Sequence, residues 1–291
     1  MKNQAILITA YKDYEQLVRL IQQLINDYFI YIHVDKKSSD IYKNLIVLFG
    51  NTKDCFIFSD YSISWGGYSH LMAIRSLLKE TLKNQCLKYV HIISGQDYIV
   101  GSRQDFSKLL QDRKIYMTCC KFENTPKDIQ NRYNKFHFIP KGCDIRSRSF
   151  NRFDKLVCKF QNHRHTIGLF NMNHVYKGVA WVSMPIEAVK YVVSFSYTIR
   201  GRLFHLGLRS CLIPEEVYFQ TILSNSRFKD TIVPNNRRYT VWTYKNGSIP
   251  AILDLSDYDA IQRDDYLFCR KVDSKISFEL IETIDSRKKL F

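Results

Sequence analysis

The sequence lacks the features that would place it in or across a membrane. A helix that crosses a bilayer needs about 20 consecutive apolar residues, and the apolar runs of this chain, such as residues 179–182, are only a few residues long. The N-terminus leads into a short apolar run at residues 5–8, without the longer apolar core or the small-residue cleavage site of a signal peptide. We therefore expect no membrane span, and a mature chain that begins at Met1 and stays in the cytoplasm.

The chain also lacks the cysteine spacings of zinc sites and disulfide frameworks. Its eight cysteines are spread from Cys55 to Cys269, with no Cys-x-x-Cys pair and no cluster that indicates zinc. Because no export signal is present, we interpret them as free, buried, small apolar side chains. No metal ligand is predicted from them.

Glycine-rich nucleotide-binding loops are missing as well. None of the 11 glycines forms a Gly-x-Gly-x-x-Gly pattern after the first predicted strand, and no Gly-x-x-x-x-Gly-Lys-Ser/Thr pattern occurs, which removes the main support for dinucleotide-binding and P-loop proteins. The Asp-x-Asp pair Asp257 and Asp259 lies at a predicted helix start, where we interpret it as capping or surface charge rather than a metal site. A bound diphosphate would then need basic side chains, and the adjacent Arg270 and Lys271 are the better candidates.

Positive charge is in excess, and it is unevenly distributed. Lys and Arg number 43 against 28 Asp and Glu, a net charge of +15, in a chain whose 45% apolar content is that of a globular protein. Residues 1–120 carry 15 basic and 11 acidic residues, whereas residues 127–165 carry ten and three, interleaved with six aromatic residues. Such a basic segment suits a nucleic acid, an anionic membrane surface or a polyanionic substrate. The alternative is a solvated insertion whose aromatic side chains anchor it to the core.

Apolar runs of strand length alternate with amphipathic stretches of helix length through the first 120 residues. This alternation predicts an α/β fold with an open, mostly parallel, Rossmann-like sheet and helices on both faces. The predicted strands are residues 5–11, 29–34, 55–58, 88–94 and 115–119, and the helices are residues 17–25, 41–49, 68–82 and 105–110. In the less regular second half we predict strands at 178–184 and 267–271, helices at 186–196 and 217–223, and an extended segment at 233–242.

Polar residues directly follow three of the predicted strands. They are residues 9–11 after the first strand, His33 and Asp35 at the end of the second, and residues 94–97 at the end of the fourth. Ligands of open α/β sheets bind beyond the carboxyl ends of the strands, and an acidic residue at the end of the second strand can hydrogen-bond a nucleotide's ribose or base. Asp35 therefore indicates a nucleotide-type ligand, although a helix N-cap would also place an aspartate there.

Seven short motifs together resemble one known family. In chain order they are HVDKKS at 33–38, WGGYS at 65–69, SGQDY at 94–98, GVAW at 178–181, PEEVYFQT at 214–221, NRRYTVW at 236–242 and FCRKVD at 268–273. The chain resembles, over residues 5–285, the core-2/I-branching glycosyltransferases of glycosyltransferase family 14, which include β-1,6-N-acetylglucosaminyltransferases and peptide O-xylosyltransferases. Without an export signal or anchor, it is similar to a bacterial-type member.

The resemblance implies a GT-A fold, a UDP-sugar donor, inversion at the anomeric carbon and no divalent cation. The catalytic base of the family's Pro-Asp-Glu motif corresponds to Glu216, and Glu215 stands where the family has Asp. The family's diphosphate-binding Lys corresponds to Lys271, with Arg270 beside it. The other implied site residues are Ala10, His33, Asp35, Asp97 and Arg238 on the donor side, with His33 and Asp35 at the uridine and Arg238 as a second diphosphate ligand, and Trp181 and Trp242 near the acceptor.

Purely structural roles remain open for several of these residues. Glu216 follows Pro214 in the first turn of a predicted helix, where the helix dipole stabilises a carboxylate in any protein. Trp181 and Trp242 could stack on a sugar ring or belong to the core.

The leading hypothesis is an inverting, metal-independent glycosyltransferase. We expect one GT-A domain over residues 1–291, with a nucleotide-binding half at 1–120 and an acceptor and catalytic half at 121–291 that carries the basic segment 127–165. It would transfer a sugar, N-acetylglucosamine first, from a UDP-sugar to a glycan or lipid-linked glycan in surface polysaccharide synthesis, at the inner face of the plasma membrane and without nucleic acid. The competing hypothesis is a non-catalytic polyanion or nucleic-acid binder that uses segment 127–165. A third assigns that segment to anionic lipid.

Overall fold

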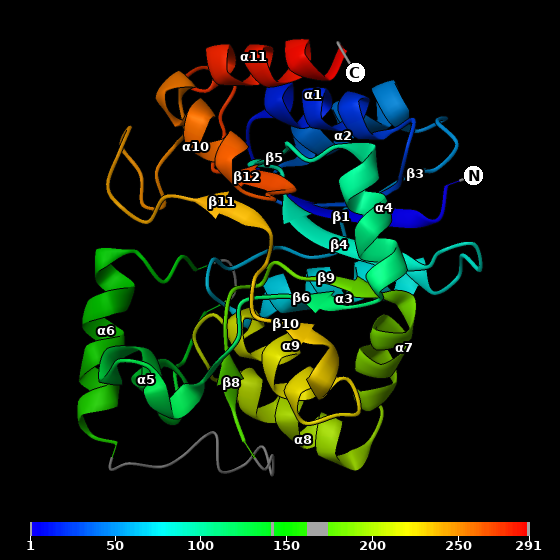
Figure 1. The fold of residues 1–291 in the computed structure, drawn as a ribbon. Helices are drawn as coiled ribbons and strands as arrows, with labels where there is room; N and C mark the ends of the chain where they lie inside the picture. Colours follow the sequence, from blue (N-terminus) through cyan, green and yellow to red (C-terminus); the bar gives the residue numbers. More distant parts are fainter. Residues whose placement is uncertain (1, 141–142, 162–173, 290–291) are drawn as a thin grey trace.

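A seven-stranded sheet runs through the centre of the protein in the order β10-β6-β9-β4-β1-β2-β3 (Figure 1). The computed structural model describes residues 2–140, 143–161 and 174–289. β1 pairs in parallel with β2 and β4, β2 with β3, and β10 with β6, whereas β9 runs antiparallel to β4 and β6. The predicted mostly parallel sheet is therefore confirmed. Its strands are β1 (Gln4–Ala10), β2 (Phe29–Val34), β3 (Cys55–Phe58), β4 (Tyr89–Ser94), β6 (Ile115–Tyr116), β9 (Ser183–Pro185) and β10 (Ile232–Val233).

Helices cover both faces of this sheet, as the alternating pattern predicted (Figure 1). β1 is buried along its whole length, which is typical of a parallel strand with both faces covered. Ala5 and Leu7 face the core of one side and Ile6 and Ile8 the core of the other. The first core includes α3 (Tyr68–Thr81), α7 (Ile186–Phe195), α8 (Ile199–Leu208) and α9 (Glu215–Ser224), and the second includes α1 (Tyr14–Leu24), α2 (Ser39–Phe49), α4 (Arg103–Asp112) and α11 (Phe278–Lys289).

A three-stranded sheet brings the motif FCRKVD, residues 268–273, close to the carboxyl end of β4. It consists of β11 (Arg238–Thr240), β12 (Phe268–Arg270) and β5 (Asp97–Ile99). β12 is antiparallel to β5 in a register that sets Arg270 opposite Asp97, and parallel to β11, which sets Arg238 opposite Phe268. The predicted strand at 267–271 is thus confirmed, and it connects segments far apart in the sequence.

The prediction of a strand over 178–184 is wrong for most of its length. Only the last residues belong to a strand, β9, and residues 178–182 are irregular. A Cβ atom at Gly178 would lie 1.9 Å from the carbonyl oxygen of Thr118, so the chain passes here only because glycine has no side chain. An apolar run cannot reveal this close approach of two backbones.

The sequence prediction also missed several short elements. The helices α5 (Lys127–Asn134) and α6 (Arg148–Lys159) lie within the basic segment, and α8 contains Gly201 and Gly207, which weaken its helical signal. Other small elements are β7 (Cys120–Lys121), β8 (Tyr176–Lys177), α10 (Tyr258–Arg263) and the 3-10 turns η1 (Phe122–Asn124), η3 (Lys229–Thr231) and η4 (Leu255–Asp257).

The Asp-x-Asp pair has the structural role predicted for it. The Asp257 carboxylate accepts the backbone N–H of Asp254 at 3.0 Å in a capping box and pairs with Lys245 at 2.7 Å. Asp259 is exposed in the first turn of α10. None of the described helices combines the length and apolar composition that crossing a bilayer requires.

Candidate active site

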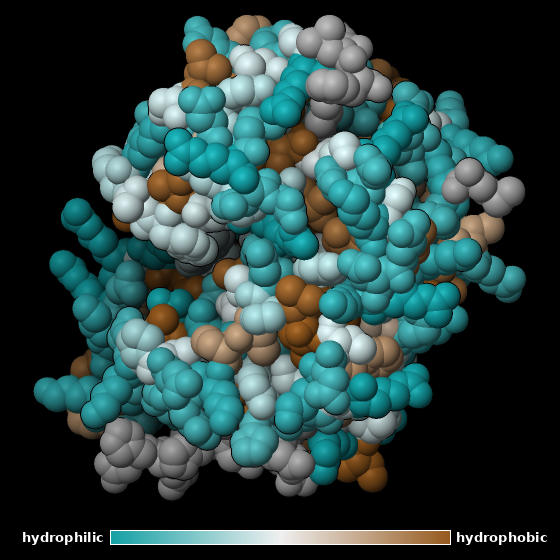
Figure 2. All heavy atoms as spheres, viewed as in Figure 1, coloured by the Kyte–Doolittle hydropathy of each residue, from teal (hydrophilic) through white to brown (hydrophobic). Residues whose placement is uncertain are grey.

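A cavity of about 660 Å³ opens at the carboxyl ends of β1 and β4, where ligands of open α/β sheets bind. Thr9 and Ala10 end β1 on its wall, and Ser94 ends β4. Eight of the ten predicted site residues line it: Ala10, Asp35, Trp181, Glu216, Arg238, Trp242, Arg270 and Lys271. The face shown in Figure 2 is mostly hydrophilic and is hollowed between the part that carries β11 and the part that carries α5 and α6.

Asp35 lines the cavity and also holds the chain beyond β3. Its Oδ1 accepts the backbone N–H groups of Lys37 at 3.0 Å and Ile63 at 3.2 Å. The alternative of a helix N-cap is wrong, because Ser38 occupies that position of α2. The Oδ2 atom lies 3.5 Å from the Lys37 ammonium.

His33 does not line the cavity; its side chain is fully buried. Its Nε2 accepts the backbone N–H of Tyr61 at 3.1 Å. Burial lowers the pKa of His33 to about 4, so the ring is neutral at physiological pH and can accept this bond. His33 thus positions the segment after β3, which reaches the cavity at Ile63 and Trp65.

Asp97 is likewise fully buried behind the cavity wall and not on it. Its carboxylate lies 2.5 Å from Nε of Arg238 and 3.0 Å from the Arg270 guanidinium, and it accepts the backbone N–H of Ser94 at 2.8 Å. Asp97 therefore holds two arginines in position from behind the cavity wall. The sequence could not show whether Asp97 contacts a ligand directly or positions residues that do.

Trp181 lies against both arginines. The guanidinium carbons of Arg238 and Arg270 are 5.5 Å and 4.6 Å from the centre of its ring. Arg238 is almost fully buried, and burial lowers its pKa to about 10. Arg270 is the more exposed arginine of the two, so it is better placed to meet an anion in the cavity.

Lys271 lines the same cavity and has no carboxylate partner among the described residues. Its Nζ donates to the Ser248 hydroxyl at 3.2 Å. Burial lowers the pKa of Lys271 to about 8, and the charges of Arg270, Lys12 and Arg146 add to this effect. A positive field without an internal counterion is complementary to a bound diphosphate.

Glu216 lies in the first turn of α9, as predicted, and its side chain reaches the same cavity. The ammonium of Lys177 is 3.0 Å from Oε2. Burial raises the pKa of Glu216, and Lys177 partly opposes this rise. A partly buried carboxylate with a raised pKa is suited to remove a proton from a hydroxyl group.

A second titratable pair on the cavity wall was missed from the sequence. His70 lies directly after the WGGYS motif, and its Nδ1 is 2.8 Å from Oε1 of the buried Glu215. Its Nε2 is 3.2 Å from the Thr9 hydroxyl. A neutral ring that donates through Nδ1 and accepts through Nε2 satisfies both contacts. Because the partners are 145 residues apart, no local spacing could indicate them.

The two predicted tryptophans differ in environment. Trp242 is 63% exposed at the cavity mouth, so its assignment to the core is wrong. Trp181 is partly buried and packs against the core, as the core alternative predicts, and it also lines the cavity. Trp65 also lines the cavity, with the Arg146 guanidinium carbon 4.2 Å above its ring.

The basic segment contributes to the cavity directly. Arg132, Asp144 and Arg146 line it. Tyr133 and Phe150 are buried, as expected for aromatic anchors, whereas Phe136, Phe138, Phe153 and Phe160 are exposed. Residues 141–142 and 162–165 of this segment lie outside the described residues.

Comparison with known protein families shows which family this chain belongs to. Residues 5–262 match the sequence profile described as Core-2/I-branching enzyme. The chain belongs to the Core-2/I-branching enzyme family.

Two relatives of this chain are named xylosyltransferases. The chain is 25% identical over 299 residues to Xylosyltransferase sqv-6 of Caenorhabditis briggsae, covering 94% of this chain and 35% of that protein. It is 24% identical over 302 residues to Xylosyltransferase 2 of Rattus norvegicus, covering 96% and 33%. The chain thus spans about a third of the length of these relatives. Among solved structures, mouse Xyloside xylosyltransferase 1 covers 92% of this chain and 97% of its own at 8% identity, with a TM-score of 0.40.

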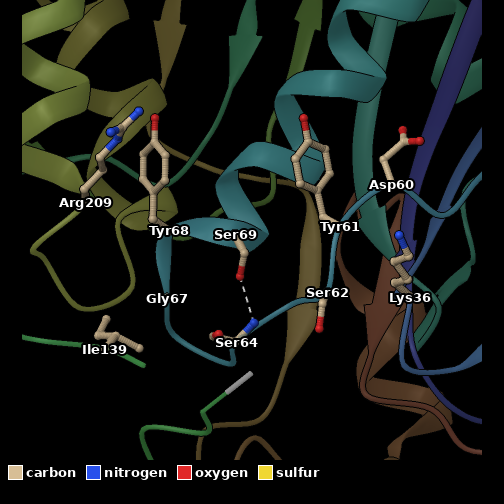
Figure 3. Close-up of a pocket in the computed structure, with 10 residues that line it drawn as sticks. All are labelled: Lys36, Asp60, Tyr61, Ser62, Ser64, Gly67, Tyr68, Ser69, Ile139 and Arg209. Atoms are coloured by element: carbon tan, nitrogen blue, oxygen red, sulfur yellow. Dashed lines mark hydrogen bonds between the residues drawn. The ribbon is translucent and has the colours of Figure 1, made fainter. Parts of the chain in front are cut away.

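A second cavity, of about 400 Å³, lies beside the first in this Core-2/I-branching enzyme family member (Figure 3). Lys36 and Arg209 lie on opposite sides of it, with Tyr61 and Tyr68 between them. Segment 62–67 separates the two cavities: Ser62, Ser64 and Gly67 line the second, and Ile63, Trp65 and Gly66 line the first.

All eight cysteines are free, as predicted, but they are not all buried. Cys86 and Cys120 are exposed. Cys158 lies in a group with His137 and Asp154 whose potential metal-ligand atoms are all within 4.8 Å of one another. The sequence spacing of these residues indicated no such cluster.

Proposed function

We propose that this chain is an inverting glycosyltransferase that moves a sugar from a UDP-sugar to a hydroxyl group of a glycan without a divalent metal ion. One observation supports this most directly. Glu216, a carboxylate whose pKa is raised, lines the same cavity as two cations, Lys271 and Arg270, which can bind the diphosphate of the donor.

These groups supply what a single displacement needs. Glu216 removes the proton of the acceptor hydroxyl as that oxygen attacks the anomeric carbon, and the UDP group leaves from the opposite face. Negative charge grows on the departing diphosphate, so Lys271 and Arg270 stabilise the transition state more than the ground state. We assign Asp35 to the uridine because it lines the cavity, and we assign Trp242 to a sugar because its ring is exposed at the cavity mouth.

For the transferred sugar we propose N-acetylglucosamine, with xylose as the alternative because the named relatives are xylosyltransferases. We assign Arg132 and Arg146 to the acceptor side, since the basic segment carries both into the cavity. A role in surface polysaccharide synthesis at the inner membrane face remains a prediction. A thermal-shift series with UDP and a panel of UDP-sugars tests the donor, because preferential binding to the folded state raises its melting temperature.

Metal independence gives the first prediction. We expect the initial rate of UDP release to be the same with added Mg²⁺ or Mn²⁺ as with no added metal, because fixed cations take the place of the metal at the diphosphate. A rate that depends on Mg²⁺ or Mn²⁺ would contradict this assignment of Lys271 and Arg270.

The second prediction concerns pH. Lys271, with its pKa lowered to about 8, is charged below that pH and loses its charge above it. We therefore expect kcat/KM for the donor to fall as pH rises through about 8, since this parameter reports groups of the free enzyme. In Lys271→Arg the fall should move to higher pH, because a guanidinium stays protonated. An unchanged profile in that variant would mean that another group causes the fall.

The competing function is a non-catalytic polyanion binder built on segment 127–165. Its exposed aromatic residues and basic side chains favour it. Tight nucleic-acid binding with a steep salt dependence, together with no thermal shift from UDP, would support this function instead. If co-sedimentation with anionic liposomes occurs alongside UDP binding, the basic segment serves the enzyme at a membrane surface.

A further inference from the structure

Three side chains of the basic segment converge outside both cavities. His137 follows α5, and Asp154 and Cys158 lie four residues apart on α6, so both are on one face of that helix. Nδ1 of His137 is 2.8 Å from Oδ1 of Asp154 and 3.7 Å from Sγ of Cys158, and Sγ is 3.9 Å from Oδ2 of Asp154. The His137 side chain is 4% exposed and that of Asp154 14%, so the group is largely shielded from water.

The hydrogen bonds of the histidine ring determine where its protons lie. Nε2 of His137 is 3.0 Å from the backbone carbonyl oxygen of Asn131, and a carbonyl oxygen only accepts, so Nε2 carries a hydrogen. In a neutral ring Nδ1 then holds a lone pair, and this lone pair faces a carboxylate oxygen and a sulfur atom. Two lone pairs at 2.8 Å repel each other unless a proton or a metal ion lies between the groups.

We propose that His137, Asp154 and Cys158 bind a zinc ion through Nδ1, a carboxylate oxygen and Sγ. Imidazole together with thiolate favours zinc over magnesium, calcium or manganese. A ring that donates its other N–H to a backbone carbonyl oxygen is the usual arrangement of a metal-binding histidine. Three protein ligands leave one tetrahedral position for water.

The distances between the three ligand atoms fit a zinc ion after a small movement of one side chain. Zinc bonds of about 2.0–2.3 Å in a tetrahedron place neighbouring ligand atoms about 3.3–3.6 Å apart. The two distances to Sγ, 3.7 Å and 3.9 Å, are close to this range. The contact of 2.8 Å between Nδ1 and Oδ1 has to lengthen, which a rotation of the Asp154 carboxylate accomplishes.

Such an ion would have a structural role. It would join α6 to the end of α5, and the backbone N–H of His137 already bonds the carbonyl oxygen of Ser210 at 2.8 Å. The segment held in this way carries Arg132, Asp144 and Arg146 into the first cavity. His137, Asp154 and Cys158 line neither of the two cavities described above, so the ion takes no part in sugar transfer.

The zinc content of the full-length chain tests the proposal. After gel filtration, the wild-type chain should retain about one zinc per molecule, and Cys158→Ser, which lacks one of the three proposed ligands, should lose most of it. Cys143→Ser is the matched control, because Cys143 is also a partly exposed cysteine of the same segment but is no member of the group. Equal zinc content in all three proteins would overturn the proposal.

Cobalt substitution of the wild-type chain tests it independently of any folding defect in the variants. The metal-free chain should bind one Co²⁺ with a thiolate-to-cobalt charge-transfer band and the intense visible bands of a tetrahedral site. Adding zinc should remove these bands, and Cys143→Ser should keep them. If the bands do not form, the contact between His137 and Asp154 is instead an ion pair between an imidazolium and a carboxylate, and the zinc site is refuted.

Discussion

Glu216→Gln should lower kcat about 10²–10⁴-fold, the usual contribution of a general base, while the affinity for UDP stays unchanged. Glutamine keeps the shape of the side chain but cannot accept the acceptor's proton. The diphosphate contacts assigned to Lys271 and Arg270 do not depend on this carboxylate. UDP release under saturating donor measures the first effect, and a thermal-shift titration with UDP measures the second.

A control separates catalysis from helix stabilisation. Glu187 is an exposed glutamate in the first turn of α7, so Glu187→Gln removes a comparable interaction with a helix dipole and nothing from the cavity. It should keep full activity and lose at most about 1 kcal/mol of stability. Turnover retained in Glu216→Gln would show that Glu216 is not the base and that its first-turn position is its whole role.

Asp97→Asn should destabilise the folded protein by about 3–5 kcal/mol, the cost of removing one partner of a buried ion pair. The buried Arg238 would then lack the carboxylate that lies 2.5 Å from its Nε. The Arg270 guanidinium would lose its ion pair as well. Urea unfolding of the two proteins gives the difference in free energy, and activity should fall together with it because Arg270 lines the cavity.

Asp265→Asn is the matched control for Asp97. Its carboxylate pairs with Arg237 at 2.8 Å, but the Asp265 side chain is 87% exposed, and exposed pairs contribute about 1 kcal/mol at most. If both variants lose the same small amount of stability, Asp97 neither neutralises a buried charge nor holds the two arginines in place.

The sequence predicted the central sheet because each strand of a parallel sheet is a short apolar run, and β1, β2 and β4 are such runs. It predicted part of the cavity wall for a related reason: residues at the ends of parallel strands meet at one edge of the sheet. Ala10 and Asp35 therefore lie on the wall. Lys271 follows β12 of the three-stranded sheet, and its prediction came from the pair of adjacent cations and from the family resemblance.

The remaining residues depend on contacts that a linear pattern does not contain. A motif marks His33 and Asp97 as important, but only the packing of β2 and β5 shows that both lie behind the wall. The pair of His70 with Glu215 joins α3 to α9, and no local spacing reports such a pair. The same holds for His137, whose partners lie on the following helix.

The segment between the two cavities, residues 62–67, forms a partition that lines both of them. Ile63 and Trp65 line one chamber, and Ser62 and Ser64 line the other. The bonds that fix the partition come from the end of β2, where His33 holds Tyr61 and Asp35 holds Ile63. Activity lost in a His33 variant would therefore report a moved partition, because His33 does not line the cavity, whereas an Asp35 variant changes the partition and the cavity wall together. A ligand that displaces the partition from the second chamber would change the shape of the first.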